Sequence, residues 1–98
     1  MLTLPIKAKW FDMIASGEKR EEYRTISPYY NSRFFARRGC GAFWMRFRNG
    51  YRTDSPLMEC LVSVRIDEGA EQWGAVPGLK YYVLLIYSVL IINQRIKQ

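Results

Sequence analysis

The residues most able to do chemistry in this chain lie in one short charged segment, Gly17–Arg24. Between Glu18 and Arg24 the segment holds six charged side chains, three of each sign, and one tyrosine. Glu22 and Arg24 stand two apart, so on an extended strand they point to one face and are expected to form a fixed ion pair. A carboxylate among cations can act as a general base, or it can help to shape a concave site that meets an anion.

Lys19 is the strongest candidate for a functional cation in this segment. It could contact a phosphate or activate a carbonyl, or it could simply pair with Glu21 or Glu22. Strict alternation along a strand would place Lys19 on the face opposite to Glu22. For both side chains to line one cleft, Lys19 has to precede the regular strand or lie at a bulge.

The composition excludes several other kinds of chemistry. The 98 residues contain no histidine, which removes Ser-His-Asp and Cys-His nucleophile pairs and every zinc site that uses histidine. The two cysteines, Cys40 and Cys60, are too few for a structural zinc cluster and are expected to be reduced thiols. We therefore expect neither a metal nor a cofactor.

The charge of the chain points to an anionic partner. The net charge is +6, with a balance of +7 in residues 1–52 and −1 in residues 53–98, so the first half supplies the basic surface. Charged residues follow Ile6 at once, which is not typical of a secretory signal. The longest apolar run, Tyr81–Ile92, is shorter than the roughly 20 residues that a membrane-spanning helix needs. A cytoplasmic protein with no membrane partner is expected.

Length and pattern predict a single domain, residues 1–98, in the α+β class. Apolar spacing and capping residues predict two helices, 7–16 ended by Gly17 and 28–38 begun by Ser27. Asn49-Gly50 is typical of a two-residue hairpin, although Asp54–Pro56 indicates a longer or second turn. Extended segments are predicted at 2–6, 18–24, 42–48, 57–66 and once or twice within 81–92. This order suggests a small mixed β-barrel with the helices plugging one end.

The second predicted helix interleaves aromatic residues with arginines. Tyr29 and Arg33 share one face and flank the charged segment, a combination that suits base stacking and phosphate contact. Phe34 and Phe35 are expected to pack in the core. Arg37 and Arg38 complement the dipole at the end of the helix and need no ligand to explain them.

The charged segment, together with the helix before it, resembles the signature of the ASCH domain, Gly-x-Lys-x-x-Glu-x-Arg, which here is Gly17, Lys19, Glu22 and Arg24. The similarity extends to Leu4–Lys7 before the helix and to Ile26–Tyr30 with Arg33 after the segment, as in short ASCH proteins of bacteria and phages. It covers about residues 2–92. The resemblance implies a barrel of the PUA-like superfamily, with a cleft that is lined by the signature residues and takes RNA or a nucleotide-like ligand.

Some ASCH proteins are hydrolases, which deacetylate N4-acetylcytidine or cleave RNA. In the deacetylase group, a lysine at the position of Lys19 works with a threonine nucleophile three residues on and with a downstream glutamate. This chain has Glu22 in place of the threonine. A carboxylate can act as a general base toward water, but it cannot replace an alkoxide. The downstream acid would be Glu68 or Glu71.

The sequence is compatible with three functions. The first is binding of RNA or a nucleotide, with ligand contacts from Lys7, Lys19, Arg24, Tyr29 and Arg33. The second is hydrolysis of RNA or of a modified nucleoside, with Lys19 and Glu22 as the catalytic pair. The third is an interaction module whose apolar strand within 81–92 pairs with another chain, a second copy in a homodimer included.

Overall fold

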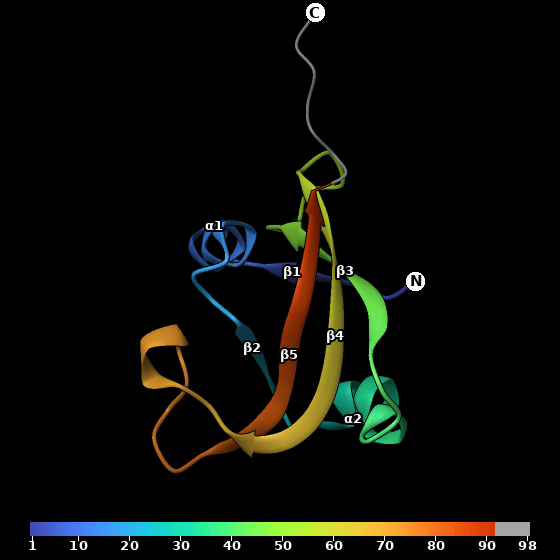
Figure 1. The fold of residues 1–98 in the computed structure, drawn as a ribbon, viewed down its shortest axis with the longest axis vertical. Coiled ribbons are helices and arrows are strands. Elements are labelled where there is room, and N and C mark those ends of the chain that lie inside the picture. The colour runs from blue at the N-terminus through green and yellow to red at the C-terminus, as the bar shows by residue number, and fades with distance from the viewer. Residues whose placement is uncertain (92–98) are drawn as a thin grey trace, which may run out of the picture.

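Two helices and five strands follow one another along residues 1–91, the part of the chain that this computed structural model describes (Figure 1). The helices are α1 (Ala8–Ser16) and α2 (Pro28–Phe34), and the turns η1 (Phe35–Arg37) and η2 (Glu71–Trp73) are single 3₁₀ turns. The strands are β1 (Thr3–Ile6), β2 (Glu21–Thr25), β3 (Phe43–Asn49), β4 (Leu57–Glu68) and β5 (Lys80–Ile91). The predicted α+β class with two main helices is confirmed.

All five strands join one mixed sheet in the order β1-β3-β4-β5-β2. β1 runs parallel to β3, and the other pairs are antiparallel. Within residues 1–91 no backbone ladder joins the two edge strands, β1 and β2, so the sheet does not close into the predicted barrel. β1 has only four residues, and its Pro5 offers no N–H to a neighbouring strand. A side chain bridges the two edges instead, because Arg24 Nη2 on β2 donates to Pro5 O at 2.8 Å.

The turn between β3 and β4 is longer than a two-residue hairpin. Asn49 N–H donates to Pro56 O at 3.0 Å, which leaves residues 50–56 as the loop. The longer turn that Asp54–Pro56 indicates is therefore the correct alternative. Gly50 N–H donates to Ile6 O at 2.8 Å, so the parallel pairing of β1 with β3 brings this loop to the end of β1.

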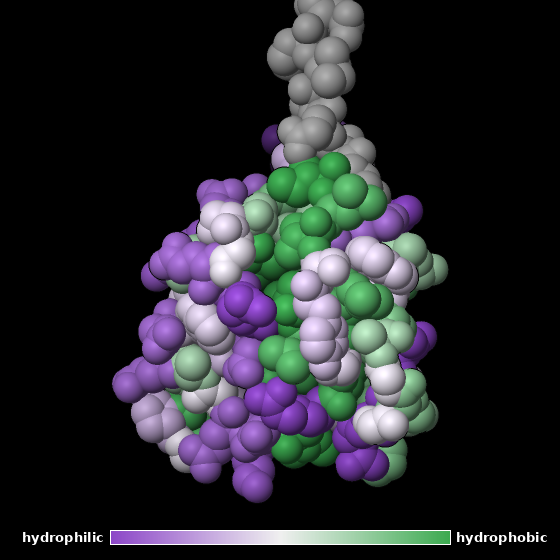
Figure 2. All heavy atoms as spheres, in the orientation of Figure 1, coloured by the Kyte–Doolittle hydropathy of each residue, from purple (hydrophilic) through white to green (hydrophobic). Residues whose placement is uncertain are grey.

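The segment 81–92 forms a single strand as far as it is described, β5. Its register against β4 shifts between Leu61 and Val62, where a bulge interrupts the ladder. β2 pairs only with Tyr81–Leu85, and in the described chain no strand covers the same edge of β5 beyond Ile86. Figure 2 shows apolar surface along these strands, and Leu90 is 53% exposed. A homodimer through this strand stays a prediction.

The core lies between one face of the sheet and the two helices. Phe34 is fully buried there, as predicted, but the prediction for Phe35 is wrong, because its side chain is 53% exposed. Neighbouring helical residues point about 100° apart, so a helix that buries Phe34 turns Phe35 outward. The predicted helix also ends earlier than Arg38, since α2 stops at Phe34 and a 3₁₀ turn follows. The main buried cluster consists of Leu4, Ile6, Phe11, Ile14, Phe34, Met45, Phe47, Met58, Cys60, Val62, Val64, Tyr82, Leu84 and Ile86.

No helix among residues 1–91 is long and apolar enough to cross a bilayer.

The two cysteines differ in environment, which gives a direct test of the core. Both thiols are free; Cys40 is exposed and Cys60 is fully buried. Burial raises the pKa of the Cys60 thiol to about 12, so its reactive thiolate is rare near neutral pH. We expect a disulfide-exchange reagent to label one thiol per native chain and two after unfolding. The variant Cys40→Ser should lose the native labelling, and rapid reaction of both thiols in the folded protein would contradict this core.

Candidate functional site

The charged segment folds so that Glu22 lies between two cations. α1 ends at Gly17, whose φ of 87° is the left-handed conformation that favours glycine. β2 begins only at Glu21, so Lys19 precedes the regular strand and is free of its alternation. Glu22 Oε1 lies 3.0 Å from Lys19 Nζ, and Glu22 Oε2 lies 2.8 Å from Arg24 Nη2. The predicted pair of Glu22 with Arg24 is confirmed, and Lys19 joins it to form an ion triad of Lys19, Glu22 and Arg24.

Lys19 is almost completely enclosed, with 1% of its surface exposed. Its Nζ donates to the backbone oxygen of Glu21 and lies 5.2 Å from the ring centre of Trp10 and 4.9 Å from that of Tyr23. Burial lowers the pKa of Lys19, and the neighbouring carboxylate of Glu22 works in the opposite direction. Because the ammonium group faces protein on all sides, Lys19 serves mainly to fix the position of Glu22.

Arg24 connects three elements of the fold. Its Nη2 bonds to Pro5 O on β1, as described above, and its Nη1 donates to the hydroxyl of Tyr30 on α2 at 3.0 Å. Its Nε is buried and, among the described residues, has no hydrogen-bond partner. Arg24 therefore sets the spacing of β1, β2 and α2 and keeps one buried donor unpaired.

A cleft of about 510 Å³ opens beside the ion triad, between the edges of β1 and β2. Glu22 and Arg24 contribute the buried charges of its wall, and Lys7 adds an exposed cation at the start of α1. This volume is typical of sites for small organic ligands. The cleft is lined by Pro5, Ile6, Lys7, Ala8, Trp10, Glu22, Tyr23, Arg24, Thr25, Tyr30, Gly50 and Tyr51.

The predicted site residues are only partly brought together. Lys7, Glu22 and Arg24 line the cleft, whereas Lys19 reaches it only through Glu22 and lines a smaller hollow of about 170 Å³ beside β5. Tyr29 and Arg33 lie outside the cleft.

Tyr29 and Arg33 nevertheless adjoin the cleft through Tyr30. The Arg33 guanidinium lies 3.4 Å from the ring centre of Tyr29, and Tyr29 packs edge-on against Tyr30 with 4.9 Å between ring centres. Tyr30 in turn lines the cleft. Tyr29 and Arg33 therefore lie on one face, as predicted, one ring away from the cavity, and their contact with a ligand stays a prediction.

Four aromatic residues line the cleft, Trp10, Tyr23, Tyr30 and Tyr51, and none of them is among the ligand contacts predicted from the sequence. The sequence favours a place for Trp10 in the core or at its rim, and it assigns no role to Tyr51. Tyr51 is 88% exposed and lies in the loop 50–56, which the parallel pairing of β1 with β3 places at the cleft. An aromatic residue directly after Asn49-Gly50 is the only local signal.

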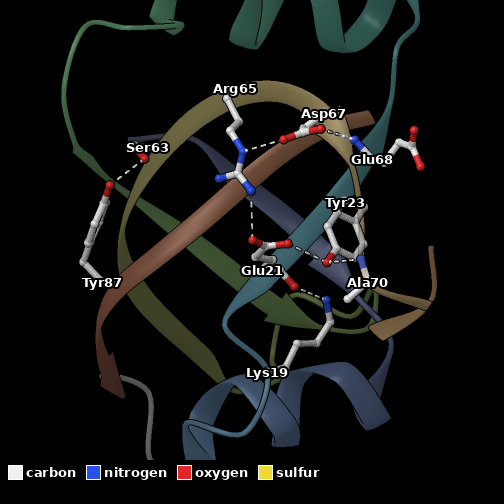
Figure 3. Close-up of polar contacts among 9 residues, drawn as sticks. All are labelled: Lys19, Glu21, Tyr23, Ser63, Arg65, Asp67, Glu68, Ala70 and Tyr87. Carbon is white, nitrogen blue, oxygen red and sulfur yellow. Dashed lines mark hydrogen bonds and ion pairs between the residues drawn. The ribbon is translucent and has the colours of Figure 1, made fainter. Parts of the chain in front are cut away.

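A second polar network lies around Glu21 and holds the loop between β4 and β5 (Figure 3). The Glu21 carboxylate accepts from the Tyr23 hydroxyl at 2.7 Å and pairs with Arg65 at 3.0 Å. The Tyr23 hydroxyl accepts in turn from Ala70 N–H at 2.8 Å. Gly69 leaves no room for a side chain, because a Cβ there would lie 2.6 Å from the Tyr23 ring. The loop is thus fixed over one of the rings that enclose Lys19.

The two candidate supporting acids lie away from the ion triad. Glu68 and Glu71 are exposed, and within the part of the chain that is described neither lines the cleft nor pairs with Lys19. Figure 3 shows the Glu68 carboxylate pointing away from the Glu21 network. Residues 1–91 also hold no group of three or more His, Cys, Asp and Glu side chains that could bind a metal ion.

Comparison of the chain with protein-family models, with curated proteins and with solved structures gives no match. The geometry of the site is therefore the basis for assigning a function.

The ion triad leads to a stability prediction. Glu22→Gln removes the carboxylate that pairs with the enclosed Lys19, and breaking a buried pair costs about 3–5 kcal/mol. Glu59→Gln is the matched control, since Glu59 pairs with Arg46, whose side chain is 37% exposed, and such pairs contribute about 1 kcal/mol or less. Urea unfolding measures both changes. Equal losses of unfolding free energy in the two variants would contradict the central role of the triad.

Proposed function

We propose that the protein binds a nucleotide, alone or within RNA, in the cleft between β1 and β2. The observation that carries this proposal is an excess of positive charge beside aromatic rings. Two cations, Lys19 and Arg24, share the single carboxylate of Glu22, and Lys7 adds a further positive charge at the opening. A phosphate in the cleft can balance this excess of positive charge.

The aromatic residues of the cleft favour a ligand with a base over a simple anion. Trp10, Tyr30 and Tyr51 line the same cavity as the cations. Flat bases stack on such rings, whereas inorganic phosphate or sulfate gains nothing from them. The combination therefore supports a nucleotide-like ligand.

Membership of the ASCH family, and with it the PUA-like superfamily, belongs to the same proposal. Each signature residue has a physical task in this fold: Gly17 ends α1 in the left-handed conformation, and the other three form the ion triad. The two edge strands lie on either side of the cleft and are joined by Arg24. A cytoplasmic location, where nucleotides and RNA are abundant, is part of this proposal.

The same geometry favours binding over hydrolysis. Both oxygens of Glu22 contact cations, so a proton taken up by this carboxylate weakens two ion pairs. Lys19 is enclosed, and within residues 1–91 neither Glu68 nor Glu71 lines the cleft or pairs with a residue of the triad. A hydrolase built on Lys19 and Glu22 would need these groups to be accessible to substrate and water.

Binding is tested with exposed residues of the cleft, whose replacement should leave the fold intact. Tyr51→Ala and Lys7→Gln are each expected to weaken the binding of ribonucleoside 5′-monophosphates by roughly tenfold, since stacking of a base on a ring is worth about 1–3 kcal/mol and a charged hydrogen bond to phosphate about as much. Titration calorimetry at low salt measures the affinities.

Tyr87→Ala is the matched control for Tyr51→Ala. It removes another exposed tyrosine, which lies on β5 outside the cleft. Its affinity for the nucleotides should equal that of the parent chain. If the parent chain binds neither nucleotide nor RNA at low salt, or if Tyr51→Ala and Tyr87→Ala behave alike, the proposed function is wrong.

A further inference from the structure

Three arginines outside the cleft each lie over an aromatic ring. The Arg33 guanidinium is 3.4 Å from the ring centre of Tyr29, and the corresponding distances are 3.7 Å for Arg38 over Phe35 and 4.0 Å for Arg37 over Phe43. Arg33 lies in α2, Arg37 lies in η1, and Arg38 directly follows η1. We call these three arginines and three rings the arginine–aromatic surface.

The positive charge of this surface is not balanced by the protein. None of the ion pairs found within residues 1–91 involves Arg33, Arg37 or Arg38. Arg33 and Arg38 donate to backbone oxygens of their own turns instead. The side chains of Arg37 and Arg38 are exposed, so their charge is available to a partner.

The exposed rings require an explanation that the helix dipole does not give. Tyr29 is 52% exposed and Phe35 is 53% exposed. Cations at the end of a helix complement its dipole, which accounts for the arginines but not for aromatic rings beside them. A guanidinium stacked on a ring keeps its N–H donors in its own plane, where they can reach phosphate, while free aromatic surface can accept a base.

We propose that the arginine–aromatic surface binds single-stranded RNA that extends out of the cleft. This inference rests on the proposed function and names its ligand as a strand of several nucleotides. The two sites are continuous, because Tyr29 packs edge-on against Tyr30, which lines the cleft. Tyr29 and Phe35 are six positions apart, which spans roughly 9 Å along a helix, so the surface is long enough to contact more than one nucleotide.

A single strand fits this surface better than a duplex or a membrane. The bases of a duplex are stacked inside and cannot reach exposed rings. Insertion into a bilayer would bury the rings in the acyl boundary, together with the guanidinium groups that lie on them. A single strand presents both unstacked bases and phosphates, which can meet the rings and the arginines of this surface.

The test compares two ligands and two double variants. The ligands are uridine monophosphate and a labelled single-stranded oligouridylate of about 12 nucleotides, a length within the range of known single-strand sites. Arg37→Gln/Arg38→Gln removes two charges of the surface without touching the cleft. Arg20→Gln/Lys80→Gln is the matched control, since it removes two charges from other exposed side chains.

We expect Arg37→Gln/Arg38→Gln to weaken binding of the oligonucleotide at least about tenfold. The slope of log affinity against log salt should fall by about 1.4, that is, by about 0.7 for each of the two phosphates that the variant no longer neutralises. Affinity for uridine monophosphate should be unchanged. The control variant should bind the oligonucleotide nearly as well as the parent chain.

Three other results would overturn the inference, and they differ in what they leave standing. If both double variants bind the oligonucleotide equally, the surface is not a strand site, while the cleft proposal survives. If the parent chain binds neither ligand, both proposals fail. Co-sedimentation with vesicles that contain anionic lipid is measured in parallel. If Arg37→Gln/Arg38→Gln loses binding to these vesicles but not to the oligonucleotide, the surface contacts a membrane instead.

Discussion

A lysine that is fully enclosed by protein needs an anion beside it, and this requirement organises the charged end of the molecule. Removing an ammonium group from water costs several kcal/mol unless a partner compensates. Glu22 supplies that partner for Lys19, and its second oxygen fixes Arg24. Arg24 then reaches Pro5 and Tyr30, so one carboxylate determines how β1, β2 and α2 stand around the cleft. The triad carries one positive charge more than it can balance, which makes the same arrangement both structural and receptive to an anion.

Features of the fold that depend on a few neighbouring residues can be predicted from the sequence. Gly17 ends α1, Ser27 accepts from Tyr30 N–H at the start of α2, and Glu22 pairs with Arg24 across one residue. Features that depend on distant strands cannot. Nothing near Thr3–Ile6 signals a parallel partner at β3, and that pairing decides where the loop 50–56 lies. The prediction of a closed barrel is wrong for the same reason, because closure depends on whether β1 and β2 meet.

The candidate site shows the same division between local and distant information. Glu22 and Arg24 belong to the charged segment, Lys7 precedes the adjoining helix α1, and all three line the cleft. The burial of Lys19 depends on Tyr23, which Ala70 and Gly69 hold from a loop more than forty residues away. Tyr51 reaches the site because the β1–β3 pairing brings its loop to the end of β1. Residue type and spacing therefore identify the charges of a site, whereas its enclosure and its aromatic walls depend on the topology.

The cleft and the arginine–aromatic surface differ in how far their charges are exposed to solvent. This difference implies different roles in binding. In the cleft, Glu22 and Arg24 are held by the fold at fixed distances in a partly buried setting, where electrostatic interactions are strong and a misplaced group is costly. Over α2 and η1, the exposed arginines are screened by salt within about 10 Å and can adjust to a partner. Fixed groups discriminate between ligands, and adjustable cations add affinity that tolerates sequence. A nucleotide held in the cleft would thus supply the selectivity, while the strand beyond it would supply most of the salt-dependent binding energy.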